Sequence, residues 1–226
     1  MYHRLMPIDP RRILFQDDQF LAVQKLAAEL VVAGKGKMEK LPLFDFLRKE
    51  FPGIHPVNRL DFETSGIVIF ARTKATLKAV MDSKFAGWKK YYKTIVAGTP
   101  KYAKGDIKFP LPTRQTGEKI PALTKYKLIE RFELCSFIEA EIEAGKHHQI
   151  RQHFQMLGHP LAMDRVYGDK KFNNMFGQKY KYQRFFLHAS SVEFPHPVIQ
   201  KTIKIECPLP MAFEKVLEKL RVVVSS

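Results

Sequence analysis

The residues best suited to chemistry in this chain lie in one short run, NRLDFETSG, at residues 58–66. The run sets Arg59 two positions before Asp61, and a Thr-Ser-Gly turn then leads into apolar residues typical of a buried strand. A carboxylate beside the start of a core strand is held in a defined place, and a neighbouring cation favours its charged form. A nucleophile or a general base needs both properties. A lone Arg-x-Asp pair is more often a surface turn, so other segments have to decide between the two interpretations.

Three further segments complete a recognisable set. Residues 90–98 read KYYKTIVAG, residues 145–153 read GKHHQIRQH, and residues 187–189 read LHA. Together with the run that contains Asp61, they resemble the catalytic segments of the RluA-type pseudouridine synthases. They occur in that family's order, and the resemblance spans about residues 13–208.

The chain departs from the family pattern at three places. Asn58 replaces the usual His, residues 25–28 read KLAA where a Lys-Pro-x-Gly turn is common, and Met163 replaces a common Gly. None of these changes removes a proposed catalytic group. We therefore expect altered RNA contacts rather than lost activity.

The resemblance implies a catalytic role for three side chains. Asp61 would be the essential carboxylate, which either attacks the ribose directly or assists formation of a glycal. Arg151 would pair with Asp61, and its own sequence neighbourhood agrees, because no acidic residue stands three or four positions away on the predicted helix. Tyr92 would stack on the uracil and act through its hydroxyl as the base at the ring carbon. Without the motif, a core tyrosine with a satisfied hydroxyl would be the more frequent outcome at this position.

The resemblance also implies residues that bind the RNA. Reaching a stacked base requires its extrusion from the helix, and Arg59 matches the family arginine that fills the gap. His148 matches a position that is structural or RNA-facing. We add Lys90, Lys170 and Lys171 as expected RNA-binding residues.

The reaction itself predicts that no cofactor is used. Isomerising a uridine changes no oxidation state, and the chain has neither a Gly-x-Gly-x-x-Gly motif nor a P-loop. The four histidines between residues 147 and 159 do not have metal-ligand spacing, and no cysteine lies near them. We therefore expect no metal.

The composition favours RNA as the partner. The formal net charge is +15 over 226 residues, with seven lysines against one aspartate in residues 84–108 and eight Lys or Arg against two aspartates in residues 146–184. Basic clusters with interleaved aromatic residues suit single-stranded or looped RNA, although a solvated basic face is the plainer alternative. Two widely separated cysteines, Cys135 and Cys207, indicate a reduced, cytoplasmic protein. No signal peptide or membrane span is evident, and we expect a monomer.

Hydrophobic periodicity predicts an α+β fold. We expect strands at residues 13–15, 20–24, 67–71, 91–96, 122–129, 136–142, 186–192 and 202–205, and helices at residues 43–51, 75–85, 147–157 and 211–220. Strands that follow one another directly favour an antiparallel or mixed sheet. The family resemblance implies a bent sheet with a central active-site cleft. It also implies a single catalytic domain over residues 1–226, without the S4-type RNA-binding domain of larger relatives.

Two other classes of function compete with this hypothesis. The first is an RNA-binding protein of the same fold that has lost catalysis, against which the intact Asp61, Tyr92 and Arg151 set argues. The second is a metal-dependent RNA hydrolase, for which the necessary cluster of carboxylates or histidines is missing from the sequence.

Overall fold

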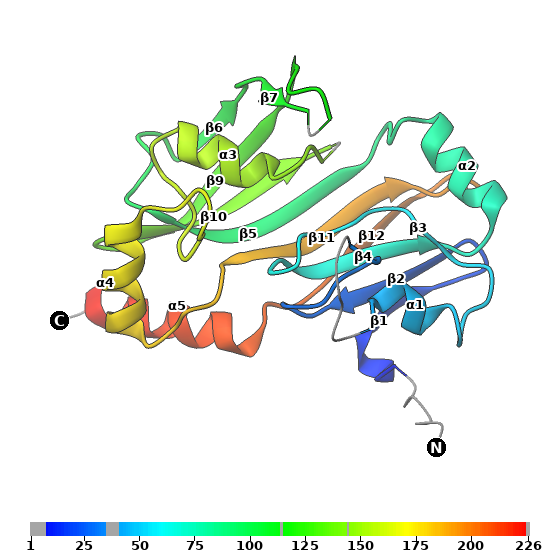
Figure 1. Ribbon diagram of the computed structural model, residues 1–226, viewed down its shortest axis with the longest axis horizontal. Coiled ribbons are helices and arrows are strands. Elements are labelled where there is room, and N and C mark those ends of the chain that lie inside the picture. The colour runs from blue at the N-terminus through cyan, green and yellow to red at the C-terminus, as the bar shows by residue number, and fades with distance from the viewer. Residues whose placement is uncertain (1–7, 35–40, 114, 144, 225–226) are drawn as a thin grey trace.

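A computed structural model describes residues 8–34, 41–113, 115–143 and 145–224 (Figure 1). Residues 1–7, which show no signal-peptide pattern, lie outside the described residues. The strands are β1 (Ile13–Gln16), β2 (Phe20–Lys25), β3 (His55–Pro56), β4 (Ser65–Ala71), β5 (Lys89–Ala97), β6 (Lys104–Ile107), β7 (Leu111–Pro112), β8 (Lys119–Ile120), β9 (Thr124–Arg131), β10 (Cys135–Ile142), β11 (Leu187–Pro195) and β12 (Thr202–Glu206). The helices are the 3-10 turn η1 (Pro10–Arg12), α1 (Leu43–Leu47), α2 (Lys74–Asp82), α3 (Gln149–Met156), α4 (Lys170–Tyr180) and α5 (Met211–Val224).

A mixed sheet of ten strands forms the body of the described part of the chain. Eight strands follow the order β1-β2-β4-β11-β5-β10-β9-β6, while β12 pairs with β11 and β3 pairs with β4. The pairings are antiparallel except between β4 and β11, which run parallel. The expected α+β fold with a mixed sheet is therefore confirmed.

The helices gather at the two ends of the sheet and over one part of it (Figure 1). Helices α4 and α5 lie together at one end, where Phe176 and Phe213 share a buried cluster with Phe186. Helices α1 and α2 lie at the other end, and α3 covers β9. The middle of the sheet, between these groups, is where β4, β11 and β5 run side by side.

The parallel pairing of β4 with β11 explains the Thr-Ser-Gly turn. In this pairing Ser65 lies opposite His188 and Gly66 opposite Ala189. A Cβ on Gly66 would stand 2.2 Å from the carbonyl oxygen of Ala189, and the φ of Gly66 is +115°. Only glycine allows the two backbones to approach this closely. The glycine therefore fixes where the loop that precedes β4, and that contains Asp61, leaves the sheet.

The buried side chains of Ser65 and His188 lock the same junction. Ser65 Oγ lies 2.9 Å from His188 Nδ1, and His188 Nε2 lies 3.2 Å from the carbonyl oxygen of Cys207. Since a carbonyl only accepts, Nε2 carries the proton and Nδ1 accepts from the serine hydroxyl. Burial lowers the pKa of His188 to about 4, so the ring is neutral at physiological pH.

The predicted strands and helices are all present, with shifted ends. Helix α2 begins as expected, with Thr73 Oγ1 accepting from Thr76 N, but it ends at Asp82 instead of residue 85. The reason is local, because Lys84 and Phe85 adopt φ values of +49° and +61°, which no helix contains. Helix α4 and the strands β3, β6, β7 and β8 were not predicted. None of the helices in the described part combines the length and apolarity that crossing a membrane requires.

Candidate active site

Asp61 lies in the loop between β3 and β4, and Lys25 at the end of β2 holds that loop in place. Lys25 is fully buried, and its Nζ donates to the carbonyl oxygens of Leu26 at 3.0 Å, Phe62 at 3.0 Å and Thr64 at 2.5 Å. All three N–H groups of the ammonium are therefore satisfied. Burial lowers the pKa of Lys25 to about 8. Two of the three carbonyls belong to residues just after Asp61, so Lys25 fixes the backbone from which the carboxylate projects.

Two of the departures from the family pattern also contact this loop. Ala28 N donates to the carbonyl oxygen of Phe62 at 2.9 Å, and Ala28 holds a φ of +63° at the position where the family has glycine. The KLAA segment thus keeps the left-handed turn without its glycine. The amide oxygen of Asn58 accepts from Ile69 N at 2.7 Å, and its nitrogen donates to the carbonyl oxygen of Ile67 at 3.4 Å. Asn58 therefore ties the loop to β4.

Arg151, on α3, lies between two carboxylates. Its Nε and Nη2 donate to the two oxygens of Asp164, both at 2.8 Å, and its Nη1 lies 3.3 Å from Oδ2 of Asp61. Burial alone would raise the pKa of Asp164, but hydrogen bonds from Arg151 and from the backbone N–H groups of Tyr167 and Val166 outweigh it and hold that pKa below its ordinary value. The expected contact between Arg151 and Asp61 is present. It is the longer of the two pairings that Arg151 makes.

His148 lies close to the same oxygen of Asp61 as Arg151 does. Its Nε2 lies 3.5 Å from Oδ2 of Asp61, and its Nδ1 lies 3.1 Å from the hydroxyl of Tyr167. The residue has a φ of +51° and stacks on His147 with ring centres 3.7 Å apart. Burial lowers the pKa of His148, although the charge of Asp61 acts in the opposite direction. A neutral ring with Nε2 protonated would donate toward Asp61 and accept from Tyr167.

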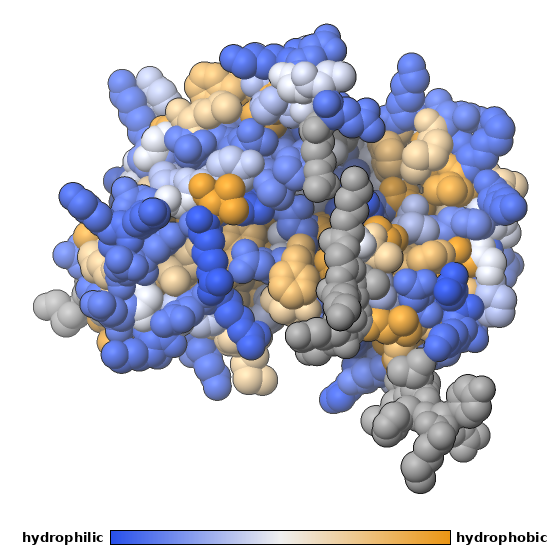
Figure 2. Space-filling model, viewed as in Figure 1, coloured by the Kyte–Doolittle hydropathy of each residue, from blue (hydrophilic) through white to orange (hydrophobic). Residues whose placement is uncertain are grey.

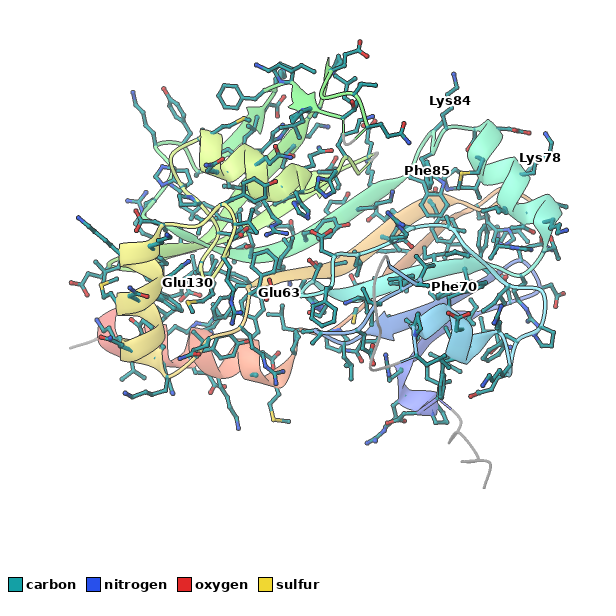
Figure 3. All side chains as sticks on the ribbon, in the orientation of Figure 1. Glu63, Phe70, Lys78, Lys84, Phe85 and Glu130 are labelled. Carbon is teal, nitrogen blue, oxygen red and sulfur yellow. The ribbon has the colours of Figure 1, made fainter. Side chains whose placement is uncertain are left out.

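Tyr92 and Lys90, two positions apart on β5, point to the same side of the sheet as alternation predicts. Both are buried, with 8% of each residue exposed. Burial raises the pKa of Tyr92, and the charge of Asp61 raises it further. Burial also lowers the pKa of Lys90 to about 8. Its Nζ lies 4.4 Å from the ring centre of Phe85, which Figure 3 labels, and it forms no hydrogen bond or ion pair within the described part of the chain.

Five of the predicted site residues line one cleft of about 740 Å³. They are Arg59, Asp61, Lys90, Tyr92 and His148. Arg151 lines an adjoining cavity of about 90 Å³ together with Asp61 and Tyr92. Arg59 is exposed and makes no ion pair among the described residues, so its side chain is free to reach a bound molecule.

The remaining two predicted residues lie elsewhere. Lys170 lines a separate groove beside α4, and Lys171 is exposed at the start of that helix, outside the lining of the groove. Sequence reasoning assigned no site role to Lys25, Asp164 or Tyr167, although each touches the Asp61 loop or its partners. The sequence signal for Asp164 was its place in the family pattern beside Met163. Among the described residues, no three His, Cys, Asp or Glu side chains cluster in a way that would hold a metal ion.

Comparisons with known proteins identify the family of this chain. The family model described as RNA pseudouridylate synthase matches residues 19–156. The ribosomal large subunit pseudouridine synthase C of Vibrio vulnificus is 31% identical over 218 residues, covering 92% of this chain and 69% of that protein. Its Escherichia coli K12 counterpart is 31% identical over 222 residues, covering 92% and 70%. This chain belongs to the RNA pseudouridylate synthase family, and within it to the RluA type.

Solved structures support the fold independently of close sequence similarity. The structure titled human RNA pseudouridylate synthase domain containing 4 covers 93% of this chain and 93% of its own, with a TM-score of 0.77 at 21% identity. The structure titled human RNA pseudouridylate synthase domain containing 1 has a TM-score of 0.69 at 22% identity and covers 92% and 94% of the two chains. The fold is that of the pseudouridine synthases.

Proposed function

We propose that this protein converts a specific uridine in structured RNA to pseudouridine, with Asp61 as the essential carboxylate. The observation that supports this most directly is the position of Asp61. Its Oδ2 stands within 3.3 Å of Arg151 and 3.5 Å of His148, at the wall of a cleft that Tyr92 also lines. A carboxylate fixed beside a guanidinium and facing open space is ready to react with a bound ribose.

The reaction breaks the bond from ribose C1′ to uracil N1 and makes one from C1′ to C5. The proton on C5 leaves, N1 gains a proton, and no electrons are gained or lost overall. Asp61 acts either by attacking C1′, forming an ester that the rotated uracil displaces, or by assisting loss of the 2′ proton to give a glycal. Both routes start from an ionised Asp61, and Arg151 balances this negative charge before the RNA binds.

Tyr92 can act as the base at C5 only together with a second group that takes the proton of its hydroxyl. Since burial raises the pKa of Tyr92, its hydroxyl is protonated at neutral pH. It can accept the proton from C5 only if it passes its own proton to a nearby base such as Asp61. The ring itself, lining the cleft beside Asp61, suits stacking on uracil.

The cations around the cleft suit an extruded nucleotide. Arg59 is exposed and unpaired within the described chain, as a side chain that fills the gap left by the base must be. Lys90 is a buried amine without a hydrogen-bond partner among the described residues, and a phosphate or a uracil carbonyl would supply one. The relatives are named as synthases of the large ribosomal subunit, which favours ribosomal over transfer RNA. We further propose a cytoplasmic monomer that grips RNA through the domain described here.

The test is release of tritium from RNA labelled at C5 of uridine, with purified protein, no cofactor and a chelator present. Large-subunit ribosomal RNA and bulk transfer RNA are offered separately. We expect release from ribosomal RNA, and none with Asp61→Asn, whose affinity for the RNA should stay within a few-fold of wild type because shape is kept while charge is removed. RNA binding without release by the wild-type protein would instead identify an inactive RNA-binding member of the family.

A further inference from the structure

A second groove in the described part of the chain is separate from the cleft of Asp61. It has a volume of about 930 Å³ and lies between α4, the loop before it and the segment after it. Four exposed cations line it: Arg165, Lys170, Lys181 and Arg184. Figure 2 shows hydrophilic side chains gathered over this end of the molecule.

These cations have no acidic partners in the part of the chain that the structure describes. None of the four makes an ion pair with an Asp or Glu among the described residues. The acid in the lining, Asp164, is buried and already neutralised by Arg151. A cation of α4 outside the groove differs in this respect, since Lys179 lies 3.8 Å from Glu133. Mutual repulsion of the four groove cations is therefore uncompensated within the described chain, and a polyanion would relieve it.

The rest of the lining suits nucleotides. Asn174, Gln178 and Gln183 present amide groups with no hydrogen bond inside the described chain, and amides can bond to base edges. Tyr182 adds a half-buried aromatic ring. A positively charged groove with an aromatic side chain in its wall is the usual combination in proteins that hold single strands.

The groove is connected to the catalytic side chains through one ion-pair network. Asp164 lies in the groove wall and holds Arg151, whose Nη1 reaches Asp61. We propose that this groove binds a single-stranded segment of the substrate RNA that flanks the target uridine while the uridine occupies the Asp61 cleft. The proposal rests on the proposed function for its substrate and adds a second binding surface. An acidic protein partner would also satisfy the charges, but the continuity with the catalytic residues favours the RNA already bound there.

The test measures how RNA affinity depends on salt. The probe is a fluorescent oligouridylate of about 12 nucleotides, long enough for one single-strand site. The groove variant is Lys181→Gln with Arg184→Gln. The control is Lys179→Gln with Lys215→Gln, which removes the same charge from exposed positions of α4 and α5 outside the groove. If both groove cations contact phosphates, the log–log slope of affinity against salt should become shallower by about 1.4, while the control changes it by far less.

A second pair of substitutions in the groove, Arg165→Gln with Lys170→Gln, should reproduce the effect. The same change in slope for both pairs could not come from a folding defect of one variant. All four groove side chains are exposed, so the melting temperatures of these variants should match that of the control.

In turnover of tritiated ribosomal RNA, the groove variants should lose kcat/KM in proportion to affinity and keep kcat at saturation within about twofold. Equal slopes for groove and control variants would overturn the proposal, and so would a loss of kcat with unchanged affinity. Failure of the proposed function would look different, because the binding measurement needs no turnover.

Discussion

Arg151 is held by Asp164 more firmly than it holds Asp61. Two hydrogen bonds of 2.8 Å join Arg151 to Asp164, whose side chain is 1% exposed, whereas a single contact of 3.3 Å joins it to Asp61, whose side chain is 34% exposed. Asp164 therefore positions the guanidinium, and the guanidinium in turn faces Asp61. The two carboxylates share one cation but differ in solvent exposure. Removing that cation should therefore destabilise the protein mainly through Asp164, which water does not reach.

Replacing Arg151 by Leu should destabilise the protein by about 3–5 kcal/mol, because Asp164 would remain as a buried, unpaired charge. Adding Asp164→Asn should recover a large part of that loss. Adding Asp61→Asn should recover little, since water already reaches Asp61. Urea unfolding of the three variants measures this directly. Equal recovery by both second substitutions would mean that Asp61 is as poorly solvated as Asp164.

Tyr92→Phe should separate the two roles of this residue. The ring stays, so stacking and RNA affinity should stay within a few-fold of wild type. The hydroxyl goes, so kcat should fall by about 100-fold or more if it relays the C5 proton. Single-turnover rates with saturating enzyme report on this step. A Tyr92→Phe protein that turns over at the wild-type rate would leave Tyr92 with stacking alone.

Ala28→Gly should stabilise the protein by about 1 kcal/mol. Ala28 holds a φ of +63°, a conformation that costs an L-residue with a side chain roughly 1–2 kcal/mol, and glycine avoids that cost while losing some entropy on folding. Thermal unfolding compares the two proteins. Ala27→Gly is the matched control, because Ala27 is not among the residues with positive φ, and it should destabilise instead.

His188 should make stability depend on pH. Its pKa is about 4 in the folded protein and near 6.5 in the unfolded chain. Between these values the unfolded chain binds a proton that the folded protein does not, so stability is complete above pH 6.5 and falls as the pH drops toward 4. The loss should reach about 3 kcal/mol. His188→Asn should lose this pH dependence while costing stability at neutral pH. A wild-type curve that is flat over this range would contradict the assignment.

Much of the fold and of the site followed from local patterns in the sequence. Each predicted strand appears within a few residues of its expected place, because burial and alternation leave a clear period along the chain. Asp61, Tyr92 and Arg151 could be named as one set because each belongs to a short motif that resembles the RluA-type family pattern. Helix α4 was missed because Asn173, Asn174 and Gly177 lower its intrinsic helix propensity. Its stability comes from Phe176 and Tyr180, whose burial depends on distant residues.

The interactions that no local pattern predicts are those between segments. The expectation for Arg151 was a partnership with Asp61, and the stronger partnership with Asp164 depends on how the loop after α3 folds back. Lys25 looked like an ordinary residue at a strand end, and its burial follows from the carbonyls that the Asp61 loop turns toward it. Spatial proximity of this kind is decided by topology.

The junction of β4 with β11 has a consequence for how the protein is made. Ser65 and His188 are 123 positions apart, so the strand that follows the Asp61 loop gains its parallel neighbour only after most of the chain exists. Such distant pairings are slow to form, since the intervening chain must be ordered first. At about 5–20 residues per second, a ribosome would need roughly 6–25 seconds to synthesise the intervening segment. During synthesis only the start of this edge, at Ser65 and Gly66, lacks its neighbour, because β3 already pairs with Phe70 and Ala71 and Asn58 bonds to the backbone of Ile67 and Ile69. We therefore expect the Asp61 loop to reach its final position only after β11 has been synthesised.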